Sequence, residues 1–68
     1  MIISKGLSVF FRDGNLTYYG IVQHCHGDKA KVKITNVYSP CEERRKEGEA
    51  MIGKVYCIVQ KSLFYIEL

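Results

Sequence analysis

Lys29-Ala30-Lys31-Val32-Lys33-Ile34 is the stretch that decides the fold class of this chain. Lysines and apolar residues alternate strictly along it. Because successive side chains of a β-strand point to opposite faces of the sheet, a strand here would place the three lysines on one face and the three apolar side chains on the other. The pattern therefore predicts a half-buried β-strand with a row of positive charge on its solvent side.

The segments before this stretch also favour β-structure. Leu7, Val9 and Phe11 lie at alternate positions, and the turn-forming residues Asp13-Gly14-Asn15 follow them. Residues 17–25 are rich in β-formers and partly apolar on both predicted faces, and Gly20 within them suits a bend or a close approach of another backbone segment. With a turn at residues 26–28 and a third strand over residues 29–37, the sequence predicts a three-stranded meander.

The second half of the chain predicts a short polar element and two more strands. Ser39-Pro40-Cys41-Glu42 reads as a capping box, with Ser39 as the N-cap residue and Pro40 at the first helical position, so we expect a helix over residues 40–47 that ends at Gly48. A loop is the alternative, because residues 42–47 contain no apolar side chain for a helix to bury. Strands are expected over residues 52–60 and 63–68, with a tight turn or a turn of 3₁₀ helix at residues 61 and 62.

The composition predicts one small cytoplasmic domain spanning residues 1–68. An apolar content of 47% argues against disorder, and no apolar run approaches the roughly 20 residues that a membrane-spanning helix needs. No signal peptide is readable at the N-terminus, and the three cysteines form an odd set that indicates reduced thiols. The net charge of +3 suits a nucleic acid, an acidic protein surface or simple solubility.

Five short strands in 68 residues predict an all-β fold in which the sheet curls into a small barrel. The chain resembles the SH3-like family of small barrels, which includes KOW and Tudor modules. The resemblance is carried by Lys5-Gly6-Leu7-Ser8-Val9, by Gly20-Ile21-Val22, by the alternating residues 29–34 and by residues 55–67. It implies a five-stranded barrel and a binding role rather than catalysis, with nucleic acid, the ribosome, peptides or modified side chains as ligands. An OB-fold barrel is the alternative, because that fold has a helix between strands three and four.

The candidate binding site is the solvent face of the predicted lysine strand. Lys29, Lys31 and Lys33, with Lys54 beside them, would pair with phosphates, and Tyr19 and Tyr56 on adjoining strands would offer stacking surfaces. RNA or single-stranded DNA is therefore a possible partner. The alternative is that the lysines only protect a strand edge from pairing with another chain.

A protein partner or a homodimer is the other possible partner. Strict alternation puts Ile21 and Ile58 on the same outer face as Tyr19 and Tyr56, and exposed apolar groups of this kind mark interfaces. If the alternation slips at a bulge, some of these side chains belong to the core instead.

No catalytic residue, cofactor or metal site is predicted from the sequence. His24 and His26 would share one face of a strand, but a zinc site needs four convergent ligands, and adding Cys41 or Cys57 would require tertiary closure that the sequence does not show. Cys41 lies near a predicted helix start, without an acid or base of defined geometry beside it. The expected role is binding, not enzymatic.

Overall fold

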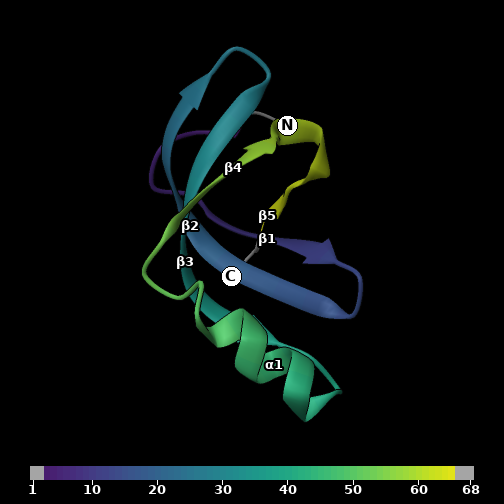
Figure 1. Cartoon of the computed structure of the whole chain (residues 1–68). Helices are drawn as coiled ribbons and strands as arrows, with labels where there is room; N and C mark the ends of the chain where they lie inside the picture. Colours follow the sequence, from purple (N-terminus) through teal and green to yellow (C-terminus); the bar gives the residue numbers. More distant parts are fainter. Residues whose placement is uncertain (1–2, 66–68) are drawn as a thin grey trace.

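The computed structural model describes residues 3–65 (Figure 1). A long, twisted antiparallel sheet carries one helix at its lower end in this view. The elements, in chain order, are β1 (Ser8–Asp13), β2 (Leu16–His26), β3 (Lys29–Tyr38), α1 (Glu42–Glu49), β4 (Val55–Val59), the 3₁₀ helix η1 (Gln60–Ser62) and β5 (Phe64–Tyr65). Within this part of the chain, no helix is long and apolar enough to cross a membrane.

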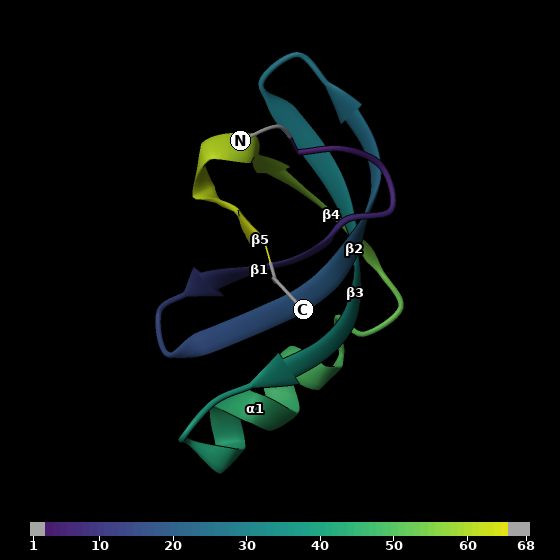
Figure 2. The same cartoon turned by 180° about the vertical axis from the view of Figure 1, so that it is seen from behind.

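The strands form an open sheet in the order β4-β3-β2-β1-β5. The broad expectation of an all-β chain is confirmed, with α1 as a short addition. The expected closed five-stranded barrel is wrong, as is closure in the form of an OB-fold, because β4 and β5 are the two edges of the sheet (Figure 2). Only two residues of β5 are described as strand, and they pair with β1, so the described chain supplies no ladder that would join β5 to β4.

The lysine strand lies where the alternation predicts it. The three lysines of β3 are exposed, whereas Ala30, Val32 and Ile34 are at most 1% exposed. These apolar side chains form the centre of a core to which β1, β2 and the residue before β5 also contribute. Its buried members are Ile3, Val9, Phe11, Leu16, Tyr18, Val22, Ala30, Val32, Ile34, Val37 and Leu63.

Two irregularities interrupt the ladder between β2 and β3. The register shifts between Tyr19 and Gly20 and again between Val22 and His24. At the first shift the backbones come so close that a Cβ on Gly20 would collide with the carbonyl oxygen of Lys33, so the expected close approach at Gly20 is confirmed. The second shift exchanges the faces of the residues that follow it, since the side-chain period of a strand is two.

Helix α1 is present, but it begins two residues later than predicted. Cys41 is its N-cap residue and makes no side-chain cap, and the hydroxyl of Ser39 instead accepts the N–H of Cys41 at 3.1 Å. The expected capping box is therefore wrong. Ser39 is buried, and its hydroxyl accepts a backbone N–H in the turn before the helix rather than a free N–H of the first helical turn.

The helix packs on the sheet through a glycine rather than through an apolar face. Gly48 is its one buried residue, and a Cβ there would lie 2.8 Å from the side chain of Val37 and 3.1 Å from that of Leu16. The lack of a side chain at Gly48 thus lets α1 approach β2 and β3 closely. This contact explains how a helix without apolar residues is held on the sheet.

The predicted faces of β4 are reversed. Tyr56 lies opposite buried Val32 and Ile58 lies opposite buried Ala30, and both side chains pack against the core. The outward placement of Tyr56 and Ile58 expected from the sequence is therefore wrong. After β4 the chain makes the expected 3₁₀ turn, η1, and the predicted continuation of the last strand through residues 66–68 lies outside the described residues.

Candidate functional site

The candidate site is the face of the sheet that turns away from the core, here called the outer face. Opposite residues of neighbouring strands share a face, so the ladders define three cross-strand rows on it: His26-Lys29-Val59, His24-Lys31-Cys57 and Ile21-Lys33-Val55. The lysine of each row lies in the middle, on β3. Two residues apart along the strand, neighbouring lysines have Cα atoms about 6.6 Å from one another.

The register shift after Val22 brings two histidines to this lysine row. Without the shift, the alternation that buries Tyr18 and Val22 would continue along β2, and the side chain of His24 would lie on the core side of the sheet. With it, Cys25 turns inward, where its thiol donates to the carbonyl oxygen of Ile3 at 3.3 Å, and both imidazoles lie on the outer face. Their rings are stacked, with centroids 6.5 Å apart.

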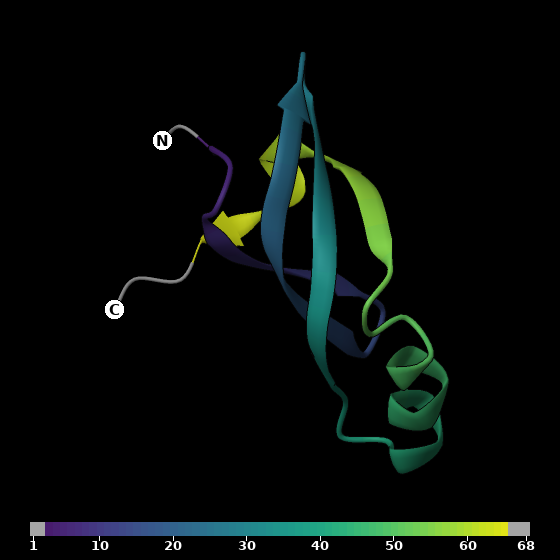
Figure 3. The ribbon, with the colours of Figure 1, turned by 90° about the vertical axis from the view of Figure 1, so that its left-hand side faces the viewer.

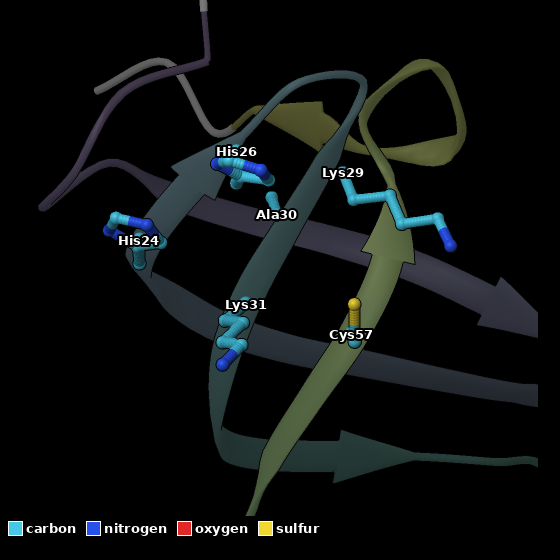
Figure 4. A pocket seen from close by; sticks show the side chains of 6 residues that line it. All are labelled: His24, His26, Lys29, Ala30, Lys31 and Cys57. Atoms are coloured by element: carbon cyan, nitrogen blue, oxygen red, sulfur yellow. The ribbon is translucent and has the colours of Figure 1, made fainter.

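A hollow of about 140 Å³ lies on this part of the outer face (Figure 4). It is lined by His24, His26, Lys29, Ala30, Lys31 and Cys57. The view shows the two imidazoles on β2, the lysines on β3 and the thiol of Cys57 on β4 around it. Its wall is almost entirely apolar, so the hollow itself offers carbon surface, and the positive charge lies on the lysine ammonium groups around it.

Nothing on the central strands neutralises the lysines. β2, β3 and β4 contain no aspartate or glutamate. Within residues 3–65 the ion pairs are confined to α1, where Arg44 and Arg45 pair with neighbouring glutamates. The outer face therefore presents positive charge that no carboxylate of these strands offsets.

An aromatic cluster continues the outer face toward the other edge of the sheet. Phe10 of β1 stacks on Phe64 of β5 with ring centroids 5.2 Å apart, and it lies 6.0 Å from the ring of Tyr19 on β2. Phe64 is 54% exposed, and the other two rings are partly exposed. Ile21, 39% exposed, follows Tyr19 along β2 and faces Lys33, so the cluster and the lysine row form one continuous surface.

The structure brings together some of the sequence-predicted residues and separates others. Lys29, Lys31, Lys33, Tyr19 and Ile21 lie together on the outer face. Lys54 does not join them. It lies in the turn before β4, where its carbonyl oxygen accepts the N–H of inward-facing Ile34 at 2.9 Å.

Tyr56 and Ile58 are also absent from the outer face, for the reason given above. Tyr56 belongs to an inner aromatic group, with ring centroids 5.1 Å from Phe11 and 6.4 Å from Tyr18. Burial, and then the nearby carboxylate of Asp13, raise the pKa of Tyr18 above its ordinary value. Tyr56 is thus a partly buried member of an aromatic group that packs against the core.

The titratable residues do not assemble into a metal centre. Among residues 3–65 no group of three or more histidine, cysteine or acidic side chains could hold a metal ion. Cys57 is separated from the histidine pair by strand β3, and Cys41 is exposed at the start of α1.

Four outer-face residues escaped the sequence reasoning. Phe10 and Phe64 could have been found from alternation, because Phe10 lies between the inward residues Val9 and Phe11, and Phe64 follows buried Leu63. The position of His24 and His26 beside the lysines could not have been predicted, because no residue type in β2 indicates the bulge that moves them to the outer face.

Comparison with known proteins adds no relative to this description, since no family model, no curated protein and no solved structure matches the chain.

Proposed function

We propose that this chain is a non-catalytic module that binds single-stranded nucleic acid through its outer face. The observation that carries the proposal is the continuity of two surfaces: a row of three lysines on strands that contain no carboxylate, and a cluster of three aromatic rings that are partly or largely exposed. Positive charge attracts any phosphate backbone, whereas exposed rings stack on bases that a duplex keeps hidden. The combination favours a single strand.

The lysine row supplies the electrostatic part of binding. Lys29, Lys31 and Lys33 extend over about 13 Å of strand, so one nucleic-acid backbone could pass all three ammonium groups. If each lysine neutralises one phosphate, the logarithm of the affinity falls with the logarithm of the salt concentration with a slope of about −2. Raising the salt from 50 to 200 mM would then weaken binding roughly 20-fold.

The aromatic cluster supplies the part that does not depend on salt. A base stacked on an exposed ring contributes about 1–3 kcal/mol. Phe64 is the most exposed of the three rings and has Phe10 behind it, which holds its plane. A base would stack on the free side of Phe64 while the backbone runs across β2 toward the lysines.

The order of the strands supports a relation to SH3-like modules as part of the same proposal. β1, β2 and β3 form a meander, β5 pairs back with β1, and a 3₁₀ turn separates β4 from β5. These are the features of the chain that resemble that family, although the sheet remains open.

Fluorescence anisotropy with labelled single-stranded RNA, single-stranded DNA and duplex DNA tests the proposal. We expect the single strands to bind at low salt, and the double reversal Lys31→Glu with Lys33→Glu to lower their affinity at least 10-fold. The control is Lys5→Glu with Lys46→Glu, which changes the net charge equally at exposed positions outside the strands and should alter the affinity far less. Equal losses in both pairs would mean that only the total charge matters, and would contradict a defined site.

Two substitutions of one residue separate stacking from general apolar contact. Phe64→Ala and Phe64→Leu should both weaken binding while leaving its salt dependence unchanged, because each removes the ring and neither removes a charge. Full affinity in Phe64→Leu would show that an apolar contact suffices, and would remove base stacking from the proposal.

A further inference from the structure

We infer that β4 is a pairing edge, and that its partner is β4 of a second copy of this chain. β4 has the sequence Val55-Tyr56-Cys57-Ile58-Val59, with no charged residue and no proline. It forms one edge of the sheet, and Figure 3 shows no element of residues 3–65 along its free side. Natural sheets usually protect such an edge with charge, proline, a bulge or a covering segment, and none of these is present on the described β4.

The hydrogen bonds show which backbone groups of β4 point outward. Ile34 donates its N–H to the carbonyl oxygen of Lys54, and Gln60 donates its N–H to that of Asp28, so these positions at the two ends of β4 face β3. Alternate residues of a strand direct their N–H and C=O groups to opposite sides. Tyr56 and Ile58 therefore also bond to β3.

It follows that the N–H and C=O groups of Val55, Cys57 and Val59 point to the free edge. They are evenly spaced and uninterrupted, which is the arrangement that another extended strand recognises.

A second copy fits this edge because the edge is complementary to itself. If two β4 strands pair antiparallel about a two-fold axis at Cys57, then Cys57 faces its own copy and Val55 faces Val59 in both directions. Every outward N–H then meets an outward C=O. On the outer face, the side chains of Val55 and Val59 would pack against each other across the seam, and Val55 is 52% exposed without a partner.

The lysine rows of β3 do not oppose this pairing. The exposed Lys54 and Lys61, which flank β4, would meet at the two ends of the seam, whereas the rows on β3 would lie three strand spacings apart, about 14 Å, in the joined sheet. That distance exceeds the Debye length at physiological salt, about 8 Å. The two lysine rows would lie on one continuous surface with the apolar seam between them.

Cysteine crosslinking in the absence of nucleic acid tests the register directly. In the paired edges the two Cys57 Cα atoms would lie about 5.5 Å apart. We expect a short bismaleimide to link Cys41→Ser, which keeps Cys57, and not Cys57→Ser, which keeps exposed Cys41. The linked fraction should rise with protein concentration, and sedimentation equilibrium should show a concentration-dependent dimer.

Two substitutions on the edge complete the test. Val55→Lys places a charge on the seam at an exposed position, and Cys57→Pro removes an N–H that no described group uses. Each should abolish the dimer, and circular dichroism should show that at least Val55→Lys stays folded. A monomer at 1 mM overturns the inference, as does a dimer that Cys57 does not link. Neither result touches the proposed nucleic-acid site, which is assayed on the monomer at low concentration.

Discussion

Replacing Gly48 with alanine sets two measurable effects against each other. Alanine is favoured over glycine in a helix by at most about 1 kcal/mol, so the local effect of Gly48→Ala is stabilising. The new methyl group, however, would lie 2.8 Å from Cγ2 of Val37 and 3.1 Å from Cδ2 of Leu16. Overpacking of this kind typically costs about 1–3 kcal/mol.

The contact with Val37 decides the sign. Leucine side chains can rotate away, but valine is stiff at χ1, and Val37 is a buried strand residue. We therefore expect Gly48→Ala to lower the free energy of unfolding by about 1 kcal/mol, which corresponds to a fall in Tm of about 4–8 °C for a domain of this size.

Urea denaturation followed by circular dichroism measures this change, and a double-mutant cycle identifies its cause. In a Val37→Ala background the obstructing methyl groups are gone, so Gly48→Ala should be neutral or stabilising there. If Gly48→Ala stabilises the wild-type chain, or destabilises both backgrounds equally, the close packing of α1 on the sheet is not what holds the helix.

Three further predictions concern the hairpin, the core and the bulge. The side-chain amide of Gln60 donates to the carbonyl oxygens of Gly27 and Lys29 at 3.1 and 3.0 Å. Gln60→Glu keeps the shape of the side chain but loses both donors, so it should lower the free energy of unfolding by about 1–2 kcal/mol in urea denaturation. An unchanged midpoint would contradict a stabilising role for these two hydrogen bonds. Because burial raises the pKa of Tyr18, the folded state keeps the phenol neutral, so the free energy of unfolding should fall as the pH rises past the ordinary tyrosine pKa of about 10. Tyr18→Phe should make this alkaline decline shallower. Equal declines in both proteins would show that Tyr18 does not cause it. Gly20→Ala drives a methyl group into a backbone carbonyl of the neighbouring strand, so we expect the free energy of unfolding to fall by at least about 2 kcal/mol as that strand is displaced. A two-dimensional NMR spectrum with shifts confined to residue 20 would argue against this displacement.

The sequence predicted those parts of the fold in which local pattern and tertiary contact agree. Strand β3 is the clearest case, because its alternation of charged and apolar residues has one sensible orientation. Strand β4 is apolar on both sides, so period two alone could not tell which side faces the core. Its faces are set by the register with β3, which puts Tyr56 opposite buried Val32.

The candidate site was predicted in the same partial way. The lysines and Tyr19 follow from alternation, whereas the histidines reach the outer face through a bulge that depends on the pairing of two strands. Helix α1 shows a third kind of limit, since its packing residue, Gly48, contributes by having no side chain and leaves no hydrophobic signal in the sequence.

The salt dependence of single-strand binding tests the central claim most directly. Affinity for a labelled single-stranded RNA, measured by anisotropy from 50 to 200 mM salt, should give a log–log slope of about −2 for the wild-type chain and a slope of about −0.7 for Lys31→Ala with Lys33→Ala. An identical slope in the two proteins, or no binding at 50 mM salt, would contradict the assignment of the outer face as a nucleic-acid site.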